Sequence, residues 1–143
     1  MRFMIIVKSC DEFEAETQPT PDDPALMAAM ASYHEALARA GVLLDAAGLH
    51  PSRSGWRIHY EGGQRRVVDG PFAESKELIA GYTLIEVRNK EEALEWSRRF
   101  PNPAGEGKPA VVELRQLIEL DDFEPGPDVQ RFRELNLPSA SSR

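Results

Sequence analysis

The amino-acid sequence predicts an α+β fold. Strand-like and helix-like patterns follow one another in the order β-α-β, then a hairpin, then β-α-β. Two further observations support this order: polar capping residues precede both helical patterns, and two adjacent glycines separate two alternating strand-like runs. At 143 residues the chain suits one domain, which we place at residues 1–120, followed by a tail over residues 121–143.

The first predicted elements are a central strand and a helix. Residues 2–8, RFMIIVK, are apolar on both alternating faces, as in a strand that is covered on both sides. The polar residues 11–23 are expected to form a loop. Asp23 and Pro24 suit the N-cap and first position of a helix that Gly41 ends. The apolar face of this helix is predicted to consist of Leu26, Met30, Tyr33 and Leu37.

The next predicted elements are an irregular edge strand over residues 42–55 and a hairpin over residues 56–69. In the hairpin, Trp56, Ile58 and Tyr60 alternate with polar residues, and Gly62-Gly63 can adopt the positive φ angles of a tight turn. We therefore expect two antiparallel strands here.

The last predicted elements are a strand over residues 79–88, a helix and a final strand over residues 110–120. Asn89 and Glu92 form a plausible N-cap and capping-box pair for the helix, and Pro101 ends it. The tail contains one possible helical turn at residues 129–135, and its last residues are expected to be disordered.

Without the hairpin, the predicted order is the βαββαβ unit of ferredoxin-like folds. We therefore predict a ferredoxin-like domain with an inserted β-hairpin. Both helices of such a unit cover the same face of an antiparallel sheet. Because strand 2–8 is apolar on both sides, the other face needs a cover, and a second copy of the chain would supply it. We expect a homodimer.

The composition disfavours several classes of protein. Seventeen basic and 24 acidic residues give a net charge of -7, so direct nucleic-acid binding is not expected. The N-terminal apolar run is too short for a signal peptide or a membrane span, so no membrane association is expected. The single cysteine, Cys10, cannot form an internal disulfide, which favours a cytoplasmic location.

A longer string of residues resembles a known family. Asp69-Gly70-Pro71-Phe72, Glu74, Lys76-Glu77 and Gly81-Tyr82 stand in the strand order described above, together with AGVLLDAAGLHP at residues 40–51 and VELR at residues 112–115. With these motifs, residues 1–120 resemble the DGPF branch of the YCII-related proteins.

The resemblance implies a dimeric α+β barrel, in which two ferredoxin-like sheets pack face to face and enclose clefts. It also implies two functions. Some relatives in the wider superfamily are enzymes that eliminate halide or act on small ring compounds through a histidine–aspartate pair. Some DGPF proteins are associated with alternative sigma factors of RNA polymerase.

Two residues are candidates for a catalytic pair. Asp69 could act as an acid–base or orienting carboxylate, or it could be a turn residue that bonds the backbone near Gly70. His34 flanks the apolar face of the first long helix, where it could point into a cleft or be partly exposed to solvent.

The residues after Asp69 are candidates for binding a ligand. Gly70, Pro71 and Phe72 are expected to form a structural corner that also serves as a cleft wall, with Phe72 buried. Gly70 would be required if it has a positive φ. Glu74 and Lys76 follow in a charged loop, which could instead be merely solvated.

Arg115, on the last strand, is the remaining candidate: it could bind a ligand carboxylate or form an ion pair with Glu113. The three histidines and Cys10 have no metal-ligand spacing, and no residue pattern implies a cofactor.

Three hypotheses of function remain. The first is a homodimer that binds a small aromatic or carboxylated metabolite. The second is an enzyme that uses Asp69 and His34 in elimination or isomerisation. The third is an accessory protein of a transcription regulator.

Overall fold

A four-stranded antiparallel sheet forms the centre of the protein in a computed structural model, which describes residues 1–15 and 23–138. Its strands are β1 (Arg2–Lys8), β2 (Leu43–Gly48), β5 (Ile79–Glu86) and β6 (Val112–Gln116), in the order β2-β5-β1-β6. The predicted central position of β1 is confirmed, since it pairs with β5 on one side and β6 on the other. This mixed α+β arrangement is compatible with a ferredoxin-like fold.

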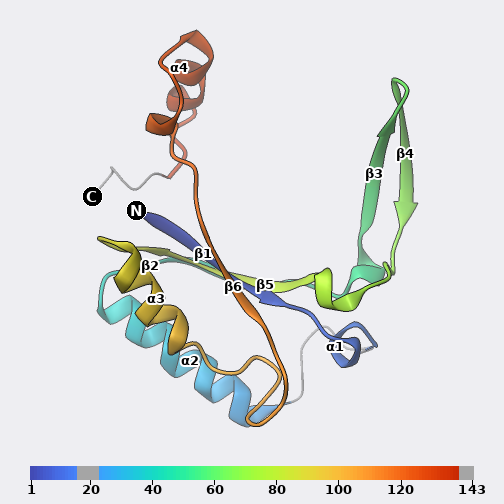
Figure 1. Ribbon diagram of the computed structural model, residues 1–143, viewed down its shortest axis with the longest axis vertical. Coiled ribbons are helices and arrows are strands. Elements are labelled where there is room, and N and C mark those ends of the chain that lie inside the picture. The colour runs from blue at the N-terminus through green and yellow to red at the C-terminus, as the bar shows by residue number, and fades with distance from the viewer. Residues whose placement is uncertain (16–22, 139–143) are drawn as a thin grey trace.

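Two helices, α2 (Pro24–Arg39) and α3 (Lys90–Arg98), cover the same face of this sheet (Figure 1). Their predicted N-caps are confirmed. The Asp23 carboxylate accepts a hydrogen bond from the Leu26 amide, and the Asn89 side chain accepts one from the Glu92 amide. The prediction of a capping box was wrong in one respect. The Glu92 carboxylate accepts hydrogen bonds from Arg88 and not from the amide of Asn89.

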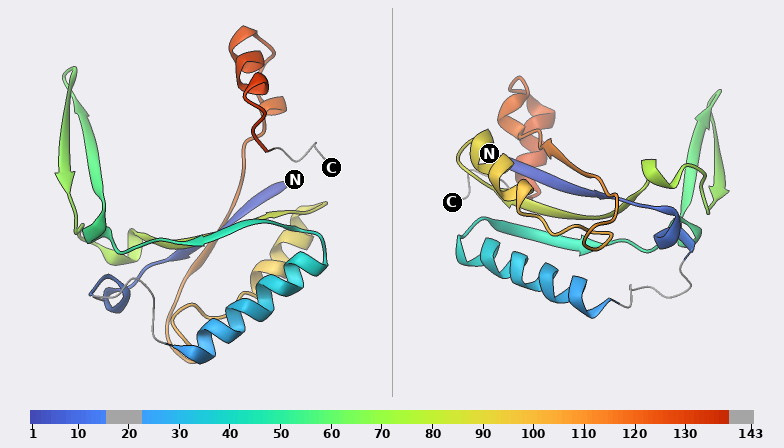
Figure 2. Two further views of the ribbon diagram at one scale, coloured as in Figure 1. Left: turned by 180° about the vertical axis from the view of Figure 1, so that it is seen from behind. Right: turned by 60° about the horizontal axis from the view of Figure 1, so that its bottom comes forward.

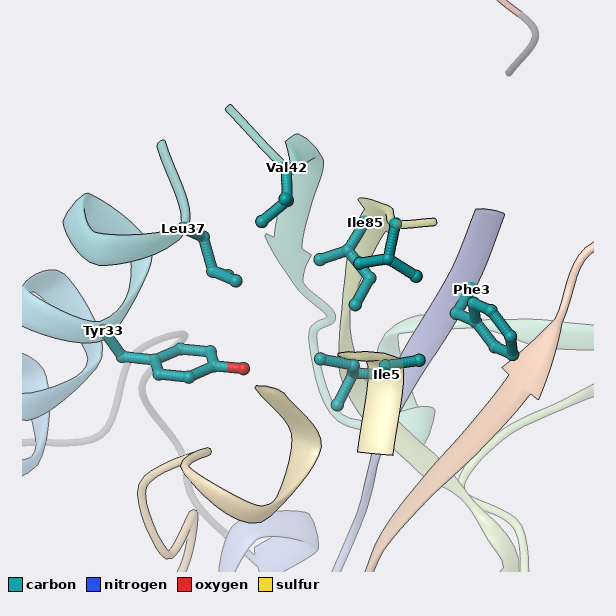
Figure 3. Close-up of a cluster of buried hydrophobic side chains, with 8 residues drawn as sticks. Phe3, Ile5, Tyr33, Leu37, Val42 and Ile85 are labelled. Carbon is teal, nitrogen blue, oxygen red and sulfur yellow. The ribbon is translucent and has the colours of Figure 1, made fainter. Parts of the chain in front are cut away.

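The hydrophobic core lies between these helices and the sheet. Figure 3 shows Tyr33 and Leu37 of α2 directed toward Ile5 and Ile85 of the two central strands. Ile5, Leu37 and Ile85 are completely buried, and burying one such aliphatic side chain contributes about 1.5–3 kcal/mol. The remaining members of this buried cluster are Phe3, Val42, Val87 and Ala93.

A separate two-stranded sheet consists of β3 (Trp56–Glu61) and β4 (Gln64–Asp69). The two strands are antiparallel and meet at Gly62 and Gly63, with φ angles of 55° and 79°. These positive angles match the turn that the glycine pair predicted. We call residues 56–69 the β3–β4 hairpin. In the views of Figures 1 and 2 it projects from the side of the four-stranded sheet opposite α2 and α3.

The C-terminal part of the chain projects on that same side (Figures 1 and 2). It contains the short helices η3 (Leu120–Asp122) and α4 (Pro127–Glu134), and we call residues 117–138 the C-terminal arm. The predicted helical turn is thus an eight-residue helix, whereas the final strand is shorter than the predicted 110–120. The expected disorder at the end of the tail concerns residues 139–143, which lie outside the described part.

One segment that was expected to be a loop forms a helix. Residues Asp11–Ala15 form α1, and the Glu14 amide donates to the carbonyl of Cys10 at 3.0 Å. Carboxylates in the first turn of a helix are favoured by its dipole, which explains why this acidic stretch can be helical. The rest of the expected loop, up to residue 22, lies outside the described residues.

Candidate functional site

Gly70 lies in a tight corner between β4 and the short helix η2 (Ser75–Glu77). Its amide donates to the carbonyl of Gly55 at 2.9 Å. A Cβ atom at this position would lie 1.9 Å from the carbonyl oxygen of Ser52, closer than any real contact. Gly70 does not have a positive φ, so a close approach of two backbone segments, and not its φ angle, requires glycine here.

Ser52, in the short helix η1 (Ser52–Ser54), connects this corner to α1. Its hydroxyl accepts a hydrogen bond from the Phe72 amide at 3.0 Å and itself donates to the Glu14 carboxylate. The Ser52 amide donates to the same carboxylate at 3.0 Å, and the Arg53 guanidinium donates to the carbonyl of Glu14. The corner is therefore held by hydrogen bonds to a charged group, which are stronger than neutral ones.

Phe72 is half-buried and not the fully buried anchor that the sequence suggested. The guanidinium carbon of Arg57, an exposed residue of β3, lies 3.9 Å from the centre of the Phe72 ring and covers one face of it. Arg57 makes no ion pair with any residue that the structure describes. A cation is thus presented on an aromatic ring, without a carboxylate to neutralise it.

The charged residues that follow Phe72 point to solvent. Glu74 and Lys76 are both exposed, and Glu74 has a φ of 59°, which is uncommon for a residue other than glycine. Ser75 between them is fixed to α1, because its hydroxyl donates to the Asp11 carboxylate. Pro71 is exposed beside them. The loop therefore presents charges of both signs from a held backbone.

The Asp69 carboxylate is exposed at the end of β4, opposite Trp56 of β3. It accepts no hydrogen bond from residues 1–15 or 23–138, so the expected bond to the backbone near Gly70 is not made. Asp69 remains available to solvent and to a ligand.

His34 lies on α2, on the helix-covered side of the sheet, away from the β3–β4 hairpin that carries Asp69 (Figure 1). Its Nδ1 is 2.7 Å from the carbonyl oxygen of Met30, and its Nε2 is 2.8 Å from the hydroxyl of Thr83 on β5. Its ring also meets the rings of Tyr33 and Phe100 edge-on. Within one chain the structure does not bring His34 and Asp69 together.

Arg115 lies on β6, at the edge of the sheet opposite β2. Its guanidinium donates to the Glu113 carboxylate at 3.3 Å, and Lys8 lies 3.9 Å from the same carboxylate. The expected alternative of a structural ion pair is present. Because Arg115 is largely exposed, this pair contributes little to stability.

Two tyrosines have shifted pKa values. Burial raises the pKa of the Tyr33 hydroxyl to about 12, although the charge of Arg99 opposes this shift. The hydroxyl of Tyr82, on the sheet face away from the helices, donates to the Asp45 carboxylate at 2.9 Å, and this bond raises its pKa.

Glu14, Ser52 and Arg57 are the residues of this site that sequence reasoning missed. They come from three different elements, and Glu14 and Ser52 are 38 positions apart. Only the alternation of Arg57 with Trp56 and Ile58 marked it as belonging to one face of a hairpin strand.

The described residues contain neither a metal-binding cluster nor a membrane-spanning helix. No cluster of three or more histidine, cysteine or carboxylate side chains there could hold a metal ion. No helix in the described part of the chain is long and apolar enough to cross a membrane.

Comparison with known proteins places the chain among relatives. Residues 1–120 match the model of the YCII-related domain. An uncharacterized protein of Rhizobium meliloti (strain 1021) is 30% identical over 92 residues, which cover 64% of this chain and 74% of that protein. The domain match extends from β1 to the start of η3 and includes both the four-stranded sheet and the corner at Gly70. The chain therefore belongs to the YCII-related family.

Proposed function

We propose that this protein is a homodimer that binds a small carboxylate-bearing metabolite beside residues 69–76. The observation that carries the proposal is the Arg57 guanidinium, which lies on the Phe72 ring without an ion-pair partner among the described residues. A ligand carboxylate could accept two parallel hydrogen bonds from this guanidinium. An aromatic ring in the same ligand could pack beside Phe72.

The hydrogen bonds around Ser52 support this proposal. A binding group is most effective when its support is fixed before the ligand arrives, since less freedom is then lost on binding. The Phe72 amide is held by Ser52, which is held by Glu14. Lys76 adds a second exposed cation next to the corner, whose backbone is formed by Gly70 and Pro71. The exposed carboxylate of Glu74 would disfavour a second ligand carboxylate nearby.

The open face of the sheet supports the homodimer. Its central pairs are Met4 with Leu84 and Ile6 with Tyr82, and α2 and α3 lie on the other face. A second copy would cover these side chains and form the dimeric α+β barrel, with the β3–β4 hairpin as an insertion in each ferredoxin-like unit. Ile6 is already buried and the other three are half-buried, so a second copy would remove their remaining apolar surface from water. We place this dimer in the cytoplasm, where the single Cys10 would stay reduced.

The alternative of catalysis by Asp69 and His34 has less support. Both ring nitrogens of His34 already have partners, Met30 and Thr83, on the helix-covered side of the sheet. Arg115 would belong to a different site from Arg57, because it lies on β6 at the far edge of the sheet.

A thermal-shift experiment tests the binding proposal. The wild-type protein is heated with a panel of small carboxylates, benzoate and phenylacetate among them, and with the matching neutral amides. Binding to the folded state raises Tm. We expect carboxylates to raise Tm, amides to have little effect, and Arg57→Gln to abolish the difference.

Arg39→Gln is the matched control, because Arg39 is an exposed arginine on α2 with only a surface ion pair. This variant should respond as the wild type does. Equal responses of Arg57→Gln and wild type, or no response of wild type to any carboxylate, would overturn the proposal.

A further inference from the structure

One face of the β3–β4 hairpin, which we call its apolar face, exposes four large apolar side chains and also carries Asp69 opposite Trp56 and Arg65 opposite Tyr60. Ile58 and Val67 face each other across the two strands, and Trp56 and Tyr60 lie on the same side of β3. Trp56 is 64% exposed and Tyr60 is 68% exposed. An isolated two-stranded hairpin is only marginally stable in water, and large apolar side chains that stand together in solvent indicate an interaction surface.

The C-terminal arm exposes a second apolar surface. Phe132 and Leu135 are three residues apart at the end of α4, and Leu137 follows. Leu135 is 63% exposed. A single helix of eight residues is unstable by itself, so α4 also needs a partner surface.

The arm nevertheless has a fixed base. The guanidinium of Arg2 donates three hydrogen bonds to the Glu119 carboxylate, the shortest at 2.6 Å, and the Arg133 guanidinium donates to Asp121 at 2.7 Å. The arm is thereby held on the same side of the sheet as the hairpin, at the other end (Figure 1).

The two surfaces differ in charge. The hairpin, residues 56–69, has three arginines and two carboxylates, which gives a net charge of +1. The C-terminal arm, residues 117–138, has six carboxylates and two arginines, which gives a net charge of -4. In a chain with an overall charge of -7, the hairpin is therefore the complementary surface for the arm.

We propose that the apolar face of each hairpin packs against the C-terminal arm of a second copy of the chain. This inference rests on the proposed homodimer. Two copies that meet through their open sheet faces are related by a two-fold axis between the sheets. If this axis runs along the line from the hairpin to the arm, the two hairpins lie at the same end of the dimer. If it runs across that line, parallel to the sheets, each hairpin lies beside the partner's arm.

Charge selects between these two directions. Placing like ends together would bring two arms of charge -4 against each other, whereas the crossed arrangement pairs each arm with a positive hairpin. The crossed arrangement also covers both apolar surfaces at once, because Trp56, Ile58 and Tyr60 meet Phe132 and Leu135.

Cross-linking between differently tagged chains tests the proposal. Both chains carry Cys10→Ser, one adds Ile58→Cys and the other adds Phe132→Cys, and the mixed full-length proteins react with a short bis-maleimide. We expect a mixed-tag product and little product from either chain alone. Cross-linking of Ile58→Cys chains to each other would show that like ends meet and would overturn the inference.

Sedimentation equilibrium separates this inference from the proposed homodimer. A wild-type monomer at micromolar concentration would contradict the homodimer itself. In a wild-type dimer, Trp56→Ser and Phe132→Ser should each raise the dimer Kd about tenfold or more, as expected for large residues in an interface. Met27→Ser, at an exposed residue of α2 on the other side of the sheet, should not change it. If the wild type is a dimer but Trp56→Ser and Phe132→Ser both leave its Kd unchanged, or no mixed-tag cross-link forms, the homodimer stands and the contact between hairpin and arm is refuted.

Discussion

The imidazole of His34 joins α2 to the sheet, with its Nε2 2.8 Å from the hydroxyl of Thr83. Its Nδ1 is 2.7 Å from the carbonyl oxygen of Met30, which can only accept a hydrogen bond. In the neutral ring, Nδ1 therefore carries the proton and Nε2 accepts from the Thr83 hydroxyl. Thr83 is almost fully buried, so this bond satisfies a hydroxyl inside the core.

We expect His34→Ala to lower the free energy of unfolding by about 1–3 kcal/mol, because the buried Thr83 hydroxyl would lose its partner. Denaturant unfolding measures this change. His50→Ala, at an exposed histidine, should stay close to wild type. In the double variant with Thr83→Val the effects should be less than additive, and full additivity would show that the bond does not contribute.

Tyr33 should make the stability of the protein depend on alkaline pH. Its pKa is about 12 in the folded protein and 10.0 when unperturbed, so the folded state keeps a proton that the unfolded chain loses. The free energy of unfolding should therefore fall as pH rises from about 10 to about 12. Tyr33→Phe should show a smaller fall over this range, and identical pH dependence in the two proteins would refute the assignment.

Gly70→Ala should be strongly destabilising. The new methyl group would lie 1.9 Å from the carbonyl oxygen of Ser52, so the backbone must move. We expect this movement to lower the free energy of unfolding by about 1–3 kcal/mol. Thermal unfolding would detect this as a lower Tm. Gly126→Ala is the control, since a Cβ at Gly126 meets nothing within 4 Å and its backbone is extended.

Ser52→Ala should weaken the same corner by a different route. It removes the acceptor of the Phe72 amide and a donor to Glu14, at an expected cost of about 1–3 kcal/mol. Ser54→Ala, two residues along in η1, is the matched control, because Ser54 is exposed and its side chain makes no hydrogen bond with described residues. Equal denaturant midpoints for the two variants would mean that Ser52 does not hold the corner.

Features that depend on neighbouring residues could be predicted from the sequence. Asp23 and Asn89 cap helices, and Gly62-Gly63 forms a turn, because these effects act over two to four residues. The central position of β1 followed from its apolar residues on both faces.

The contacts of the corner could not be predicted in this way. Glu14 reaches Ser52 across 38 positions from a helix without an apolar face, and Arg57 reaches Phe72 from another strand. The role of Gly70 was expected to be conformational, but it depends on the position of Ser52, which is set by the tertiary fold. His34 was placed correctly beside the apolar face of its helix, but its partner Thr83 lies 49 positions away.

The central claim is that a small carboxylate binds beside Arg57 and Phe72. The most direct test is to follow the backbone amide signals of the ¹⁵N-labelled full-length protein by NMR while titrating the strongest binder of the carboxylate panel. We predict that saturable shifts concentrate at residues 52–57 and 69–76 and disappear in Arg57→Gln. Shifts centred on Arg115 and the open sheet face, or shifts that persist in Arg57→Gln, would contradict the account.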